Sequence, residues 1–277
     1  MIVKRIYQIA DVHIPTYQRM DMFAVQLEKL IASIRDDINA HNLRPEEVRI
    51  VLCGDLVHSK NIVTNELNVF ASTFIRNLSA LAKVVCITGN HDIIESNSAR
   101  IDTLTGIFKT AQFANAILLD MQLDYESGIV YDDDITWALY SYHDDFNIPD
   151  IESARDEKPN NKIIGLFHGM LIGCKLYNGY ITDSGNDKNM FDGCDAVMAG
   201  DIHKRQELKI GEIPIVYAGS PLQLDFGESI TQHGYVVWNT EDLSHEFIDV
   251  PNEFGYYDFG ITSIEDLKED KERLLDY

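Results

Sequence analysis

The chain has 277 residues, 45% of them hydrophobic, which is enough for one large domain or for one domain with a small appendage. It carries 45 acidic residues against 23 basic ones, a formal net charge of −22, so charge-driven affinity for nucleic acid should be weak unless metals, a partner or a further segment supply it. The N-terminus does not resemble a signal peptide and no apolar run has membrane-spanning length, which predicts a cytoplasmic or nuclear protein without a membrane partner.

Short β-rich runs alternate with amphipathic stretches along the chain, a pattern typical of an α/β fold. We expect strands at residues 5–10, 48–53, 84–88, 163–167, 196–199 and 215–217. We expect helices at residues 22–40 and 65–82, the second with Thr64 as its N-cap. Hairpins are expected at residues 128–131 with 136–142 and at 235–239 with 245–250, and a charged helix capped by Ser263 at 263–277. Cys53 and Cys86 fall inside apolar runs, which favours reduced cysteines packed in the core.

Five short polar motifs directly follow predicted strands. They are Asp11-Val12-His13, Gly54-Asp55-Leu56-Val57-His58, Gly89-Asn90-His91-Asp92, His168-Gly169 and Gly200-Asp201-Ile202-His203. Alone, each motif is weak, because Asp-x-His is usually polar pairing and Gly-Asp after a strand is often only a turn. Loops at strand ends converge on one rim of an α/β sheet, so together the motifs predict a single site.

The residue types in these motifs match a pair of divalent cations. Carboxylate and imidazole ligands suit manganese, iron or zinc, and one carboxylate can bridge two ions. We expect Asp55 to be that bridge. One ion would take Asp11, His13, Asp55 and His203, and the other Asp55, Asn90, His168 and Asp201. A shared water would attack phosphorus, and His91 would stabilise the developing charge or protonate the leaving oxygen.

The order of these motifs resembles the calcineurin-like metallophosphoesterase superfamily over roughly residues 6–225. The resemblance implies a four-layer α/β/β/α sandwich of two mixed β-sheets flanked by helices, with two metals at the sheet edge. Three further segments are similar to the DNA double-strand-break repair nucleases of the SbcD type. They are Lys204-Arg205-Gln206, Tyr217-Ala218-Gly219-Ser220-Pro221 and Asp225-Phe226-Gly227-Glu228.

This narrower resemblance implies a manganese-dependent exonuclease and endonuclease of a DNA repair or recombination complex, with magnesium as an alternative metal. It also implies a homodimer and a coiled-coil ABC-type ATPase partner of the SbcC kind. It carries over the ligands above except Asp201 and makes His91 catalytic. His58 would lie near the scissile phosphate or merely orient a ligand. Residues 1–250 would form the nuclease domain and residues 251–277 the start of a capping domain, cut short here.

One departure from the family pattern is Asp201, which stands where the family usually has histidine. A carboxylate there favours manganese or magnesium over zinc, unless Asp201 only hydrogen-bonds a metal-bound water. Lys204 and Arg205 are the best candidates for contacts with DNA phosphates, the alternative being a solvated pair. A second metallophosphoesterase function, a phosphatase or cyclic-nucleotide phosphodiesterase acting on small substrates, competes with the nuclease. A scaffold with a decayed metal site is the non-enzymatic alternative.

A dimer interface is expected on helix 65–82 and the segment 99–113, to which Leu104, Ile107 and Phe108 would contribute apolar surface. The alternative is ordinary packing of these side chains onto the sheet, and periodicity alone does not separate the two.

Overall fold

The computed structural model describes residues 2–94 and 100–256. Two six-stranded sheets form its centre. The first contains β1 (Arg5–Ile9), β2 (Val48–Cys53), β3 (Lys83–Ile87), β4 (Ala116–Leu118), β11 (Gly234–Asn239) and β12 (His245–Asp249), in the spatial order β12-β11-β1-β2-β3-β4. The second contains β5 (Gly128–Asp132), β6 (Ile135–Tyr140), β7 (Lys162–His168), β8 (Ala196–Gly200), β9 (Gln206–Ile210) and β10 (Ile213–Tyr217), in the order β5-β6-β7-β8-β10-β9.

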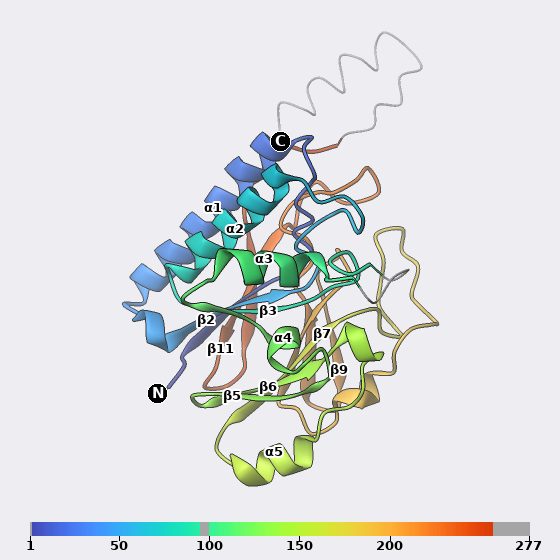
Figure 1. Ribbon diagram of the computed structural model, residues 1–277. Helices are drawn as coiled ribbons and strands as arrows, with labels where there is room; N and C mark the ends of the chain where they lie inside the picture. Colours follow the sequence, from blue (N-terminus) through green and yellow to red (C-terminus); the bar gives the residue numbers. More distant parts are fainter. Residues whose placement is uncertain (1, 95–99, 257–277) are drawn as a thin grey trace.

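Helices cover the outer faces of both sheets (Figure 1). The first sheet is covered by α1 (Met20–Ala40), α2 (Asn65–Ser79) and α3 (Thr103–Ala111), and the second by α5 (Ile151–Glu157). The remaining short elements are α4 (Leu119–Gln122), η1 (Pro45–Glu47), η2 (Tyr142–Asp144) and η3 (Lys188–Phe191). The expected four-layer α/β/β/α sandwich of two mixed sheets is therefore confirmed.

Strand β2 shows how the sequence builds these layers. Side chains alternate across a strand, so Ile50 and Leu52 pack under the helices while Val51 and Cys53 pack between the sheets. Since both faces of β2 are covered, its sequence is apolar at almost every position. The same argument explains why the central strands were recognisable from the sequence.

Most predicted elements are confirmed. Both hairpins form, with β5 antiparallel to β6 and β11 antiparallel to β12. Helix α2 begins at Asn65, and the hydroxyl of Thr64 accepts a hydrogen bond from the backbone N–H of Leu67 at 3.1 Å, as expected of an N-cap. The helix ends at Ser79, earlier than predicted, because the chain turns there to enter β3. The helix expected at residues 263–277 lies outside the described residues.

Two residues expected at a dimer interface are instead buried in the chain's own core. Leu104 and Ile107 on α3 belong to the apolar cluster between the helices and the first sheet. The prediction was wrong for these two side chains, because helical periodicity marks an apolar face without identifying what covers it. Phe108 is partly buried against the same cluster.

An ionic cluster joins the two sheets at the edge where the parallel strands of the first sheet begin. The guanidinium of Arg49 on β2 binds both carboxylate oxygens of Asp132 on β5, at 2.8 and 3.0 Å. The ammonium of Lys83 on β3 lies 2.9 Å from the same carboxylate, and the indole N–H of Trp137 donates to it at 3.1 Å. This edge is therefore fixed by buried charge pairs, whereas the polar motifs lie at the opposite edge.

At that opposite edge, β1, β2 and β3 end together as parallel neighbours, and β7 ends beside β8 in the second sheet. The five motifs follow these strands directly. The sheet topology therefore brings residues from distant parts of the chain to one rim. Among the described residues, no helix has both the length and the apolar character needed to cross a membrane.

Candidate metal centre

The backbone is in an unusual conformation at the candidate ligands. Asp11, His13, Asp55 and Asp201 all have positive φ, at 52°, 49°, 51° and 91°. Such conformations are costly for residues other than glycine and persist only where surrounding contacts fix them. Here the N–H of His13 donates to the carbonyl of Asp55 at 2.9 Å, and the N–H of Asp201 donates to Oδ1 of Asp11 at 2.9 Å. The strained turns thus hold one another in place.

Glycines allow these loops to approach closely. Gly54 has φ +81°, and a Cβ there would lie 2.3 Å from Nδ1 of His168. A Cβ on Gly89 would lie 2.3 Å from Oδ1 of Asp55. Any side chain at either position would push a candidate ligand out of the cluster, which accounts for glycine in the second and third motifs.

The first group of candidate ligands gathers around His13. Its Nε2 lies 3.1 Å from Nε2 of His203 and 3.3 Å from Oδ2 of Asp55. Asp11, His13 and His203 can direct one ligand atom each to a common point. Apart from His203, which is partly exposed, these side chains are buried. The expected first ion therefore has its ligands side by side.

The second group gathers around His168. Its Nε2 lies 3.3 Å from Oδ1 of Asp55 and 3.2 Å from the amide oxygen of Asn90. Asp201 is more distant, with its Oδ1 4.0 Å from the same nitrogen. Asp55 thus turns one oxygen toward each group, as a bridging carboxylate must. The structure also adds Asp11 to this second group, a proximity that motif spacing did not reveal.

The donor set fits divalent cations. Nδ1 of His168 donates to the carbonyl of Cys53 at 2.7 Å and Nδ1 of His203 donates to Glu228 at 2.6 Å, so both Nε2 atoms can present lone pairs to the cluster. The side-chain amide of Asn90 faces both carboxylate oxygens of Asp55 and Nε2 of His168. Oδ2 of Asp11 is buried and has no hydrogen-bond partner among the described residues. Converging lone pairs and carboxylate charge of this kind are what a pair of cations neutralises.

The electrostatics of the carboxylates agree with this. Burial raises the pKa of Asp11 to about 7 despite the nearby His168 and His203. Burial also opposes ionisation of Asp55, yet the charges of His168 and His13 and the hydrogen bonds from His168 and the backbone of His91 together leave the pKa of Asp55 below its ordinary value. The chain alone thus holds its carboxylates against one another and against protonated imidazoles, and divalent ions in their place would supply the positive charge.

The imidazole of His91 lies beside the ligands without joining either group around Asp55. Its backbone N–H donates to Oδ1 of Asp55 at 2.7 Å, and its Nδ1 donates to the carbonyl of His58 at 2.7 Å. The second bond fixes the tautomer and leaves Nε2 available for proton transfer. The His91 ring is 4.6 Å from the His13 ring and stacks 5.7 Å from the ring of His58. The ring of His58 also lies 5.5 Å from the ring of His13, so the three imidazoles of His13, His58 and His91 lie together beside Asp55.

Residues 4–205 match the calcineurin-like phosphoesterase family, which covers most of the chain. The chain belongs to this family. It is a metallophosphoesterase by family, and the family is characterised by phosphoester hydrolysis with divalent metals.

A curated relative is the uncharacterized protein R555 of Acanthamoeba polyphaga mimivirus, 30% identical over 263 residues. The match covers 92% of this chain but 18% of the relative, so the chain spans about a fifth of that protein's length. Three solved structures are similar in fold. They are an archaeal phosphodiesterase (TM-score 0.40, 13% identity, 88% of this chain and 98% of that one), zinc-bound Vps29 from Entamoeba histolytica (0.39, 11%, 87% and 88%) and the NAD nucleotidase of Haemophilus influenzae (0.44, 13%, 99% and 56%).

Two carboxylates that support the metallophosphoesterase ligands were not identified from the sequence. Asp92 is buried and accepts N–H bonds from Leu56, Val57 and Gly89, which ties the second motif to the third. Burial and the charge of Asp55 raise the pKa of Asp92 to about 8. Glu228 accepts a hydrogen bond from the Nδ1–H of His203. Both residues lie in segments singled out above, but spacing gives no indication of which atoms they bind.

The two basic residues after the last motif differ in their surroundings. Arg205 pairs with Asp249 on β12 and lies 5.5 Å from the ring centre of Phe247, so its charge is already engaged. Lys204 lies 5.5 Å from the ring centre of Tyr177, at a hollow of about 320 Å³ that is also lined by Asp201 and His203. Of the two, Lys204 is the one next to the metal centre and open to a substrate.

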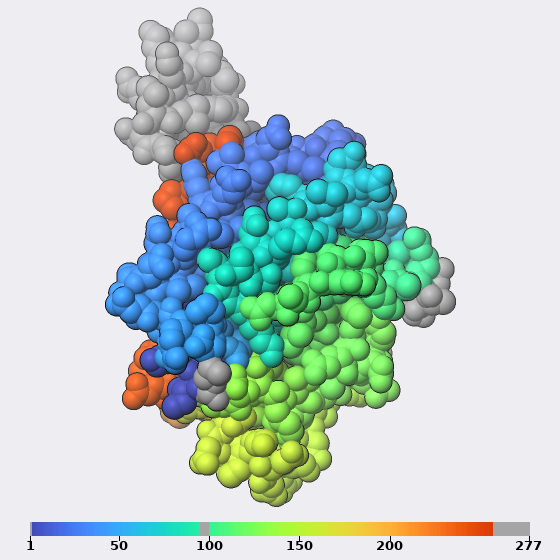
Figure 2. All heavy atoms as spheres, turned by 60° about the vertical axis from the view of Figure 1, so that its left-hand side comes forward, coloured from blue at the N-terminus to red at the C-terminus, as the bar shows by residue number. Residues whose placement is uncertain are grey.

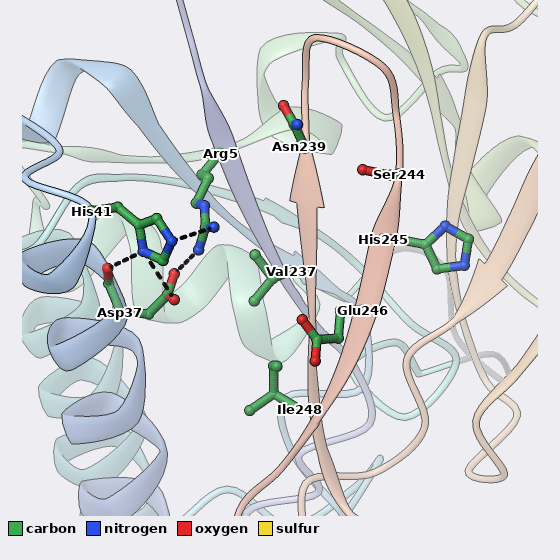
Figure 3. Close-up of a pocket in the computed structure, with 9 residues that line it drawn as sticks. All are labelled: Arg5, Asp37, His41, Val237, Asn239, Ser244, His245, Glu246 and Ile248. Carbon is green, nitrogen blue, oxygen red and sulfur yellow. Dashed lines mark hydrogen bonds and ion pairs between the residues drawn. The ribbon is translucent and has the colours of Figure 1, made fainter.

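A separate hollow of about 400 Å³ lies on the outer face of the β11–β12 hairpin beside the C-terminal half of α1 (Figure 3). Arg5 occupies its wall, where it pairs with Asp37 and contacts Nε2 of His41 at 2.9 Å. None of the predicted site residues lines it. Arg5, Asp37 and His41 are paired with one another, and the hollow is separate from the metal centre.

Proposed function

We propose that this metallophosphoesterase is a manganese-dependent DNA nuclease, a duplex exonuclease and single-strand endonuclease of a repair or recombination complex. The observation that carries the proposal is the bond between Glu228 and His203. Residues 204–228 contain the segments that resemble the repair nucleases and are not expected in phosphatases of the superfamily. Because Glu228 orients a candidate metal ligand, that nuclease-type segment is part of the metal centre itself.

The proposed mechanism assigns a separate task to each group of side chains. Asp11, His13, Asp55 and His203 would hold one ion, and Asp55, Asn90, His168 and Asp201 the other. Two bound divalent ions would supply an activated water and neutralise charge on the phosphoryl oxygens. His91 would protonate the leaving oxygen from Nε2, the nitrogen that its bond to the carbonyl of His58 leaves free. His58 would orient His91 and line the path of the scissile phosphate.

Manganese is proposed over zinc because of the charge of the ligand set. Asp11, Asp55 and Asp201 bring three negative charges against the four positive charges of two divalent ions. Aspartate at position 201 is a harder ligand than the histidine it replaces, which favours manganese or magnesium. Its oxygen lies 4.0 Å from Nε2 of His168, so a small shift of the side chain would bring it to the second ion.

The proposed partners follow from the same resemblance. With a net charge of −22 the chain alone should bind DNA weakly, so an SbcC-type ATPase and a second copy of this chain would add contacts. The face formed by α1 and α2 is continuous in Figure 2 and is the proposed dimer surface. Val69 on α2 is 67% exposed there, and Val25 on α1 is 39% exposed. These side chains, rather than Leu104 and Ile107, would form the apolar contact.

The alternative is a phosphatase or cyclic-nucleotide phosphodiesterase, and the hollow of about 320 Å³ beside His203 favours it, since that volume would accept a single nucleotide. Incubation with Mn²⁺ and either labelled linear duplex, single-stranded circles or cyclic nucleotides separates the two functions. The nuclease proposal predicts stepwise shortening of the duplex and opening of the circles, both lost in His91→Asn. Turnover of the cyclic nucleotides with both DNAs intact would refute it.

A further inference from the structure

The last described residues, 251–256, leave β12 and cross the N-terminal half of α1, at the top of Figure 1. We call this segment the strap. Glu253 pairs with Lys29 on α1 at 2.6 Å, and the ring of Tyr256 lies 4.3 Å below the guanidinium of Arg19. These contacts lie on the surface, and neither includes a residue of the metal centre.

The strap is bound to the protein interior by two hydrogen bonds between the backbone of Tyr256 and the side-chain amide of Gln223. The N–H of Tyr256 donates to Oε1 of Gln223 at 2.6 Å, and Nε2 of Gln223 donates to the carbonyl of Tyr256 at 3.1 Å. The same Nε2 also donates to the carbonyl of Glu228 at 3.0 Å. Both amide hydrogens are therefore in use, and the side chain is only 1% exposed. Gln223 cannot leave one partner without losing a hydrogen bond in the protein interior.

Glu228 carries the connection to the metal centre. The carbonyl of Glu228 is bound by Gln223. Its Oε1 accepts a hydrogen bond from the Nδ1–H of His203 at 2.6 Å, and its Oε2 accepts one from the backbone N–H of Leu224 at 2.9 Å. The carboxylate is 4% exposed, so both ends of this residue are fixed. A continuous series of hydrogen bonds thus runs from the strap through Gln223 and Glu228 to His203.

We propose that Gln223 is a positioning residue. Through it, binding of the strap to the protein surface fixes the orientation of His203 and thereby the affinity for one of the two metal ions. The inference rests on the ligand role proposed for His203 and does not require DNA to be the substrate. Lifting the strap frees the Gln223 amide, loosens Glu228 and lets the imidazole of His203 turn away from Asp11 and His13. The ligands around His168 have no part in this series and keep their ion.

The test compares two buried glutamines. Gln223→Met keeps the length of the side chain and removes the amide. Gln26→Met is the matched control, because Gln26 is also 1% exposed and donates to the carbonyl of Val250, the residue before the strap, at 3.2 Å, without contacting the strap or Glu228. Mn²⁺ binding to the intact chain is titrated by electron paramagnetic resonance and calorimetry, with the unfolding temperature measured in parallel. We expect Gln223→Met to weaken one ion about tenfold and leave the other unchanged, the size typical of outer-shell partners. Gln26→Met should lower the unfolding temperature and leave both affinities intact.

Gly255→Ala provides a second perturbation that leaves every proposed ligand and Gln223 itself in place. A Cβ on Gly255 would lie 2.8 Å from Oε1 of Gln223, so it displaces the strap from the amide. This variant should weaken the same single ion, and it decides the question if Gln223→Met does not fold.

Three results would overturn the proposal. One is full Mn²⁺ affinity at both sites in Gln223→Met or Gly255→Ala. Another is an equal loss of Mn²⁺ affinity at both sites in these variants. The third is the same loss of affinity in Gln26→Met. Each of these last two results would indicate general destabilisation. Normal Mn²⁺ binding in the unaltered chain without DNA cleavage would refute the nuclease function alone and leave the coupling intact.

Discussion

The carboxylate of Glu228 accepts a hydrogen bond from the Nδ1–H of His203, with Nδ1 2.6 Å from Oε1. This bond fixes the imidazole so that its Nε2 faces His13. Although burial opposes it, the bond to Glu228 and the charges of Asp11, Glu228 and Asp55 together raise the pKa of His203 to about 9. A carboxylate behind a ligating histidine makes the imidazole a better ligand, because it stabilises the positive charge that metal binding draws onto the ring.

Glu228→Gln is therefore expected to lower Mn²⁺ affinity roughly 10- to 100-fold at one site, since the amide removes the charge behind His203. Calorimetric titration measures this directly. Asp225→Asn is the control, because Asp225 is exposed in the same loop and its carboxylate accepts the N–H of Gly227 without contacting His203. Equal affinity in Glu228→Gln and the unaltered chain would show that the bond has no effect on the metal.

His91→Asn should lose catalysis while retaining metal. His91 touches Asp55 only through its backbone N–H, which asparagine preserves, so both ions should still bind. Removing the imidazole should slow phosphodiester hydrolysis about 10²- to 10⁴-fold, the usual contribution of a general acid. Single-turnover rates with Mn²⁺ at saturation give the comparison, and loss of bound Mn²⁺ in this variant would mean that His91 has been assigned the wrong role.

The ionic cluster at the far edge of the sheets predicts a pH dependence of stability. Burial opposes ionisation of Asp132, but Arg49 and Lys83 outweigh it and lower the pKa to about 2. A lowered folded-state pKa means that the stabilisation is fully present above the unfolded value of about 3.9 and is lost as the pH falls toward 2. Asp132→Asn should reduce the free energy of unfolding by about 3 kcal/mol at neutral pH, because it leaves Arg49 buried with only Asp133.

Chemical denaturation between pH 7 and pH 2 checks this prediction. The difference in unfolding free energy between the unaltered chain and Asp132→Asn should shrink across the acid range and approach zero near pH 2. A difference that stays constant with pH would show that the loss arises from packing rather than from charge.

The two basic neighbours of the last motif should behave differently toward DNA. Lys204→Ala should weaken binding to all sequences alike and reduce the slope of log affinity against log salt by about one, as expected when one phosphate contact is removed. Arg205→Ala should leave that slope unchanged, because Arg205 is already paired with Asp249. Salt-dependent fluorescence anisotropy with a labelled duplex would measure both slopes, and equal slopes in the two variants would contradict this assignment.

The fold and the approximate site were predictable because each ligand motif follows a strand that is buried on both faces. Such strands are apolar along their whole length, and the polar residues after them stand out, as Asp11 does after β1 and Asn90 after β3. Parallel neighbours end at one edge, so convergence followed from the fold class. The metallophosphoesterase assignment came from the resemblance of the motif order to that superfamily and is confirmed by the family match.

The parts that could not be predicted depend on contacts between loops. Glu228 reaches His203 across 25 residues of chain, and Gln223 reaches Tyr256 across 33, with no periodic pattern to mark either pair. Arg205 meets Asp249 only because β9 and β12, the outermost strands of different sheets, lie close together there. The sequence left open whether Leu104 faces a dimer partner or the sheet, since a helix's apolar face does not reveal its neighbour, and the structure shows it packed in the core.

Asp55 turns one carboxylate oxygen toward His13 and the other toward His168, so we expect it to contact two cations at once. The most direct measurement is the number of Mn²⁺ ions bound per chain at saturation, in the unaltered chain and in Asp55→Asn. We predict two ions in the unaltered chain and weakening of both in Asp55→Asn, because the substitution removes a charge that both share. A single ion at saturation, or loss of only one ion in the variant, would contradict a bridging Asp55 and the two-metal mechanism built on it.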